Sequence, residues 1–133
     1  MKYLWRGPAV GMILTAAAWL AGPVSAHHSS FMYDMSKTVT IEGVVKEFQY
    51  TNPHSWLIVE TKNDDGTMSS WGFEAEGPST LMRAGIRKSS LTPGTKITIT
   101  GHPMKDGRPA AAWVQAVLAD GTVLNPRAGF VPK

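Results

Sequence analysis

Alternating apolar and polar residues predict that the chain from residue 38 onwards is built mainly from β-strands. In "TVTIEGVVKEFQY", apolar side chains recur at every second position, as in a half-buried strand, and Gly43 indicates a bulge or bend. Three such strands are expected before residue 77, at residues 38–50, 55–62 and 67–76. The last two flank "NDDG", a typical hairpin turn. One face of the third strand carries Trp71, Phe73 and Ala75.

The spacing of apolar residues changes after the third strand. Residues 77–91 fit a short helix that Ser79 caps and that ends near Gly85. Its inward-facing residues are expected to be Leu81, Met82 and Ile86. Further strands are expected within 92–103, with Ile97 and Ile99 facing inward, and within 110–124. One helix between the third and fourth strands of a small β-domain favours the OB-fold, a partly open five-stranded barrel, over a β-sandwich.

Residues 1–26 have the pattern of a Sec-type secretory signal peptide: a basic start, an apolar middle and "VSA" as the cleavage site after Ala26. The apolar run is too short to predict a membrane span. We therefore expect a periplasmic or secreted protein with no stable membrane insertion. The remaining chain divides into an extended arm at 27–37, the OB-like domain at 38–124 and an irregular tail at 125–133.

The net charge and the absence of cysteine exclude several classes of function. Cleavage leaves 107 of the 133 residues and lowers the formal net charge from +3 to +1, because Lys2 and Arg6 are lost. Such a domain lacks the concentrated basic face that nucleic-acid binding requires, so no nucleic-acid partner is expected. The sequence contains no cysteine, which excludes disulfides, thiol catalysis and thiolate metal sites.

The four histidines predict a metal site. If cleavage follows Ala26, His27 becomes the first residue, and its amine and Nδ1 form a chelate suited to a copper-type ion. A second imidazole would complete a T-shaped "histidine brace". His54 is the first candidate for it and His102 the second, while His28 can add a ligand although the backbone restrains its reach.

Less specific interpretations remain open. His27 and His28 can be polar spacers after a cleavage site, and His54 can cap a turn. Three methionines carry thioethers that suit Cu(I), but they follow no repeated motif and packing is the favoured interpretation: Met32, Met35 and Met104.

The turn around "TNPHSW" suggests a second function. His54 and Trp56 have the same strand parity, so both can project to one side of the sheet. Together with Asn52 they would bind a partner protein or a small ligand without metal, the indole stacking on a flat group or a sugar. The alternative for Trp56 is that its ring fills the core.

Catalysis has little support. The sequence contains no Ser-His-Asp pattern, HExxH, phosphate loop or dinucleotide motif. Glu74 and Glu76 share a strand face and form a conceivable carboxylate pair. We expect a binding protein rather than an enzyme. A copper-dependent oxidative enzyme is the third possibility, because a histidine brace allows that chemistry.

Residues 27–124 resemble a family of small exported bacterial proteins catalogued only as a domain of unknown function. Its members open with His-His-Ser-Phe and continue with a Gly-x-Val strand and an Asn-Pro-His-Ser/Thr turn, as here in "HHSSFMYDMSKTVTIEGVVKEFQYTNPHSW". The later motifs correspond to Trp71 to Glu74, Leu81 to Gly85, Leu91 to Gly94 and Gly101 to Pro103. Ser30 is extra and shifts Phe31 by one position. The resemblance implies export and a compact β-domain, and no activity.

Overall fold

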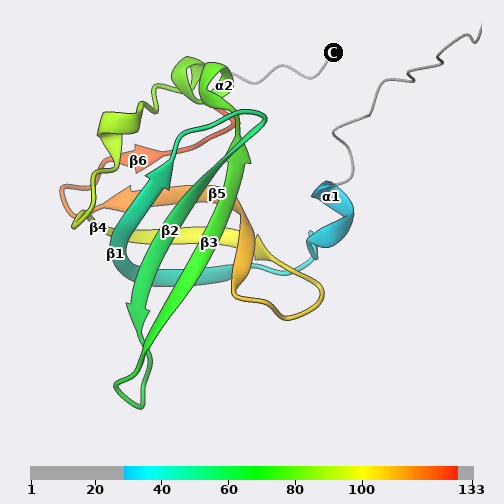
Figure 1. The fold of residues 1–133 in the computed structure, drawn as a ribbon, viewed down its shortest axis with the longest axis vertical. Coiled ribbons are helices and arrows are strands. Elements are labelled where there is room, and N and C mark those ends of the chain that lie inside the picture. The colour runs from blue at the N-terminus through cyan, green and yellow to red at the C-terminus, as the bar shows by residue number, and fades with distance from the viewer. Residues whose placement is uncertain (1–28, 129–133) are drawn as a thin grey trace, which may run out of the picture.

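The computed structural model describes residues 29–128, which form a β-barrel with short helical segments around it (Figure 1). The strands are β1 (Val39–Gln49), β2 (His54–Lys62), β3 (Met68–Glu76), β4 (Lys96–Pro103), β5 (Ala110–Leu118) and β6 (Val123–Leu124). The helices are α1 (Ser29–Met32), α2 (Pro78–Arg83) and a 3-10 helix at Lys88–Ser90. The predicted signal peptide, His27 and His28 lie outside the described residues.

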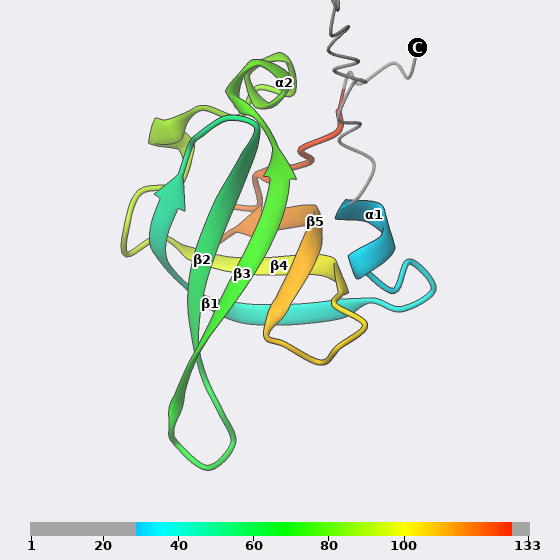
Figure 2. The same cartoon turned by 45° about the vertical axis from the view of Figure 1, so that its right-hand side comes forward.

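The first five strands close a barrel with the connectivity of an OB-fold. Strands pair antiparallel in the order β3-β2-β1-β4-β5, and a parallel pairing of β3 with β5 joins the two ends of the sheet. The strand β6 pairs with β5 outside the barrel. Figures 1 and 2 show α2 at one end of the barrel and the β2–β3 hairpin projecting beyond the other. The predicted OB-like barrel, with one short helix between strands 3 and 4, is confirmed.

The strand β1 takes part in both halves of the barrel. Its first half pairs with β4 and its second half with β2, and a register shift between Val45 and Glu47 interrupts the pairing with β2. Such a bulge bends a strand and increases its twist. At Gly43 a Cβ would stand 2.3 Å from the carbonyl oxygen of Glu60. A residue without a side chain is therefore required where β1 approaches β2 closely.

The barrel interior is apolar and draws on all five strands. Its largest fully buried side chains are Phe73, Leu57, Leu81, Ile86, Leu91, Ile99, Val45 and Val59. The inward orientation predicted for Ile97 and Ile99 is confirmed, since they are 4% and 0% exposed. Trp71 is only partly buried and its ring stacks on Phe73, with 6.3 Å between the ring centroids.

The helix α2 differs from the prediction in two respects. It begins at Pro78 with Gly77 as N-cap and no side-chain cap, so the predicted cap by Ser79 is wrong. Proline is favoured at the first helical position because its φ is already helical and its missing N–H has no partner there. Met82 is 53% exposed, so its predicted inward packing is also wrong, whereas Leu81 is fully buried. Adjacent helical side chains diverge by about 100°, so one short helix cannot bury both.

The segment before β1 was predicted as an extended arm, and this is wrong for its beginning. One turn of helix, α1, comes first, and the chain then runs beside the loop between β4 and β5 (Figure 2). Tyr33 forms a β-bridge with Met104, and the amide of Lys105 donates to the carbonyl of Met32 at 2.9 Å. Backbone bonds therefore fix this segment onto the barrel.

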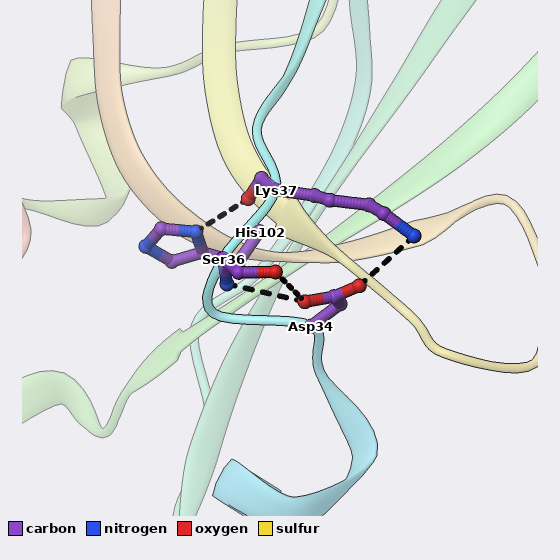
Figure 3. A network of polar contacts seen from close by, with 4 residues as sticks. All are labelled: Asp34, Ser36, Lys37 and His102. Carbon is purple, nitrogen blue, oxygen red and sulfur yellow. Dashed lines mark hydrogen bonds and ion pairs between the residues drawn. The ribbon is translucent and has the colours of Figure 1, made fainter.

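A turn at Asp34 to Lys37 continues this attachment (Figure 3). The Ser36 hydroxyl donates to Asp34 Oδ1 at 2.6 Å, and Lys37 Nζ lies 3.1 Å from Asp34 Oδ2. These contacts, Ser36 first, lower the pKa of Asp34 to about 2. Nδ1 of His102, on β4, lies 2.7 Å from the carbonyl oxygen of Lys37. The turn is thus held both internally and against the barrel.

Candidate functional site

A cavity of about 70 Å³ lies where the N-terminal segment and the residues after β6 meet the barrel. Its wall is formed by Tyr33, Met35, His54, Glu74, Ala75, Glu76, Ala112, Trp113, Pro126 and Arg127. Ionisable and aromatic side chains from five separate parts of the chain therefore converge here. Such convergence on a concave surface marks it as the candidate site.

The centre of the site is the carboxylate of Glu74, which two side chains contact. The Tyr33 hydroxyl donates a hydrogen bond to Glu74 Oε2, and His54 Nδ1 lies 2.8 Å from Glu74 Oε1. The β2–β3 register pairs His54 with Glu76 and Trp56 with Glu74, so His54 and Glu74 are diagonal neighbours on one face of the sheet. Sheet pairing fixes these two residues, and the docked N-terminal segment adds Tyr33.

The contact between His54 and Glu74 determines which ring nitrogen is available to a ligand. A bare nitrogen and a carboxylate oxygen would repel at 2.8 Å, so the proton of the neutral imidazole lies on Nδ1. The lone pair is then on Nε2, for which no hydrogen bond is found within residues 29–128. His54 is thereby oriented to accept a hydrogen bond or to bind a metal through Nε2.

Tyr33 remains a neutral donor in this network. Burial, and next its hydrogen bond to Glu74, raise the pKa of the phenol well above its usual value of 10. The tyrosine side chain is therefore protonated throughout the physiological range and does not compete with His54 as an anionic ligand.

The electrostatics of the wall favour a cation. The wall carries two carboxylates, Glu74 and Glu76, and one guanidinium, Arg127, while Arg108 is near enough to lower the pKa of Tyr33. Trp113 also lines the cavity and is 3% exposed, and its indole Nε1 is the one buried side-chain nitrogen or oxygen within the described part of the chain that has no hydrogen-bond partner. The residues of the wall thus carry more negative than positive charge, and one of them has a buried N–H group without a partner.

The turn that carries His54 is held by its own side chains. The Thr51 hydroxyl donates to the carbonyl of His54 at 3.0 Å, and the buried Ser55 hydroxyl donates to the carbonyl of Thr51 at 3.4 Å. The Asn52–Pro53 peptide is cis. A Cβ on Gly77 would stand 2.6 Å from Asn52 Oδ1, so the turn packs closely against the start of α2. The backbone of His54 is thus firmly positioned.

Of the residues predicted to bind a metal or a partner that lie within residues 29–128, the structure brings only His54 into the cavity wall. His54 lines it, whereas Asn52 is exposed in the turn and Trp56 packs across Gly72, where a Cβ would stand 3.3 Å from the indole. Trp56 does share the face of His54, as its parity predicts, and it is not a core residue. His27 and His28 lie outside the described residues.

His102, the second candidate partner for His27, lies elsewhere. It is not part of the cavity wall that His54 lines, and its Nδ1 lies against the carbonyl oxygen of Lys37 instead. Within residues 29–128, no three His, Asp or Glu side chains are grouped closely enough to hold a metal ion. A metal at His54 would therefore need further ligands other than the His, Asp and Glu side chains of residues 29–128.

Sequence reasoning did not identify several residues of this site. Tyr33 and Trp113 gave no signal, because their proximity to His54 arises from contacts between distant parts of the chain. Glu74 was noted as a possible partner of Glu76, but its carboxylate contacts Tyr33 and His54 instead. The shared strand parity of His54 and Glu74 was the one available clue.

No helix within residues 29–128 has both the length and the apolar character needed to cross a membrane.

Comparison with known proteins identifies the family and no more. Neither a curated protein nor a solved structure matches the chain. A family model does match residues 16–112, and the chain therefore belongs to the Family of unknown function (DUF6152).

Proposed function

We propose that the protein is exported, cleaved after Ala26, and binds a copper-type ion through the amine and imidazole of His27 together with Nε2 of His54. His28 is an additional ligand of the same segment. The observation that carries the proposal is the orientation of His54, whose Nδ1 lies against Glu74 and whose Nε2 is left with the lone pair.

The contact with Glu74 is the arrangement usual for metal-binding histidines. Such histidines almost always donate their other N–H to a carboxylate, a carbonyl or water, which fixes the ring and increases its basicity as a ligand. The net negative charge of the cavity wall would further favour a cation. These features support a copper-type ion, for which imidazole and amine nitrogens are suitable ligands.

The chain length allows His27 to reach the cavity. Tyr33 lines the cavity and follows His27 by six residues, of which Ser29–Met32 form the helix α1 and rise only about 6 Å, so His27 is close to the cavity along the chain. The barrel would thus supply one fixed imidazole, and the processed N-terminus would supply the remaining nitrogens.

The test is a Cu(II) titration of the exported protein, with its N-terminus confirmed by mass spectrometry and the bound ion examined by paramagnetic resonance. We expect one tight site with nitrogen couplings. Retaining one residue before His27 should remove most of the affinity, and so should His54→Ala. His102→Ala is the matched histidine comparison and should weaken binding much less, because His102 contacts the Asp34–Lys37 turn and does not line the cavity. Undiminished affinity in the extended protein or in His54→Ala would overturn the proposal.

Two carboxylates of the same cavity wall provide a second comparison. Glu74→Gln and Glu76→Gln each remove one negative charge from the wall, but only Glu74 contacts His54. Loss of such a supporting group typically weakens metal binding about 10- to 100-fold. We therefore expect a loss of this size for Glu74→Gln and a much smaller one for Glu76→Gln. Equal losses would show that charge alone, rather than the orientation of His54, matters.

A second candidate function is metal-free binding of a partner protein or small ligand by Asn52, His54 and Trp56. Trp56 supports it, because its ring lies on the face of His54 rather than in the core. Copper affinity no greater than that of a scrambled histidine-containing peptide would favour this function, and binding should then be lost in Trp56→Ala. Peroxide production driven by a reductant in the copper-loaded protein would instead indicate the oxidative enzyme.

A further inference from the structure

The three methionines that sequence analysis assigned to packing occupy different environments. Met104 is 7% exposed and bridges to Tyr33, as a packing residue does. Met32 is 45% exposed and is not part of the cavity wall. Met35 is 50% exposed and lines the cavity together with His54. Of the three, Met35 is the one that is both exposed and part of the cavity wall that His54 lines.

We propose that the thioether of Met35 and Nε2 of His54 form a site for a soft monovalent cation, Cu(I), within this cavity. The inference shares His54 with the proposed function and adds a ligand and an oxidation state to it. No electron transfer is part of it: the site binds Cu(I) as supplied.

The position of Met35 is set by the fold on both sides. Before it, the amide of Asp34 donates to the carbonyl of Pro103 at 2.8 Å. After it, the amide of Lys37 donates to the carbonyl of Asp34 at 3.1 Å, and His102 contacts the carbonyl oxygen of Lys37 (Figure 3). The sulfur is therefore carried by a turn that is fixed beside the cavity, so little ordering of the backbone is needed to bring it to a metal.

The chemistry of the donors and the wall selects the ion. Thioether sulfur is a soft ligand that prefers Cu(I), and imidazole binds copper in either state. The remaining wall combines three small apolar residues, Ala75, Ala112 and Pro126, with the carboxylates of Glu74 and Glu76, whose charge favours a cation. Mg²⁺ and Ca²⁺, which require several oxygen ligands, are disfavoured by this donor set.

The experiment measures Cu(I) affinity by anaerobic competition with a chromophoric chelator, using the exported protein with its N-terminus confirmed. Met35→Leu keeps the size of the side chain and removes the sulfur. Met68→Leu, at the exposed start of β3, is the matched control, since Met68 is 61% exposed and Met35 is 50% exposed. We expect Met35→Leu to weaken Cu(I) binding by roughly tenfold or more, equivalent to about 1.4 kcal/mol. Cu(II) affinity should stay unchanged, and Met68→Leu should alter neither.

The readouts separate this inference from the proposed function. Addition of Ag(I), a diamagnetic analogue of Cu(I), should shift the Met35 methyl resonance and leave that of Met68 in place. Cu(I) binding that depends on Met35 and His54 supports the inference even if no Cu(II) binds at His27. Equal Cu(I) affinity of Met35→Leu and the unchanged protein, with both variants folded by circular dichroism, overturns it even if Cu(II) binds as proposed.

Discussion

Replacing Glu74 by glutamine tests whether its two contacts stabilise the fold. The carboxylate accepts from the Tyr33 hydroxyl at one oxygen and faces His54 Nδ1 with the other. Glutamine has the same shape but one acceptor oxygen and one NH₂ group. With the amide oxygen turned to the Tyr33 hydroxyl, the NH₂ group faces Nδ1 of His54, so that contact survives only if the ring proton moves to Nε2, and both contacts lose the negative charge of the acceptor.

The size of the effect follows from the burial of the two donors. A hydrogen bond to a charged group contributes about 1.5–3 kcal/mol, and an unpaired buried donor costs about 1–3 kcal/mol. The Tyr33 residue is 3% exposed and cannot recover water, whereas the His54 side chain is 21% exposed and partly can. The amide oxygen should therefore turn towards Tyr33. We expect the free energy of unfolding to fall by about 2 kcal/mol.

Urea denaturation followed by tryptophan fluorescence measures this change. With a slope of about 1–2 kcal/mol per molar urea for a domain of this size, the midpoint should fall by about 1–2 M. Glu76→Gln is the control, because Glu76 lines the same cavity but its side chain has no hydrogen bond or ion pair within residues 29–128, and it should change stability by less than about 0.5 kcal/mol. Equal midpoints for the two variants would refute the assignment of a structural role to the Glu74 contacts.

Three further predictions concern packing and pH. Gly101→Ala would place a Cβ 2.6 Å from the carbonyl oxygen of Ala112, so we expect a loss of about 2–3 kcal/mol in the same titration, and a loss below 0.5 kcal/mol would contradict the close approach. Because the folded state raises the pKa of Tyr33, the unfolded chain releases this proton first, so stability should fall as the pH rises above 10. Tyr33→Phe should flatten that decline, and an unaltered slope would exclude Tyr33 as its source. The pKa of Asp34 is lowered from 3.8 to about 2 by folding. Its carboxylate therefore stabilises the folded state above pH 3.8, and this stabilisation is lost as the pH falls towards 2. The Lys37 amide resonance should report this transition, and Asp34→Asn should abolish it.

The barrel was predictable because its determinants are local. Strand alternation over 38–50, 55–62 and 67–76 marks which residues face inward, and "NDDG" fixes the register of the hairpin between the last two. Once three strands, a helix and further strands are placed in order, few compact arrangements close a barrel. The short helix was harder, because six residues sample too little of the helical period to identify its buried side.

The site was only partly predictable, because it depends on tertiary docking. His54 was identified from its turn, but the hydrogen bond that connects Tyr33 to Glu74 spans 41 positions. Nothing local in "SFMYDMSK" indicates that this segment lies across the barrel, and its composition favours no regular structure. The docking of this segment also places Met35 in the wall of the cavity, which its sequence neighbours do not predict.

His54 and His102 show why identical side chains in one protein need not have the same function. Each directs Nδ1 to an oxygen, at 2.8 Å and 2.7 Å, and each is left with Nε2 as its available nitrogen. The oxygen differs: a carboxylate increases the basicity of the ring more than a backbone carbonyl does, because it carries a full negative charge. The location differs as well, since His54 lines the cavity and His102 attaches the Asp34–Lys37 turn to β4. His102 thereby holds in place the segment that positions Met35, while His54 provides the nitrogen, so the two histidines contribute to one proposed site in separate ways.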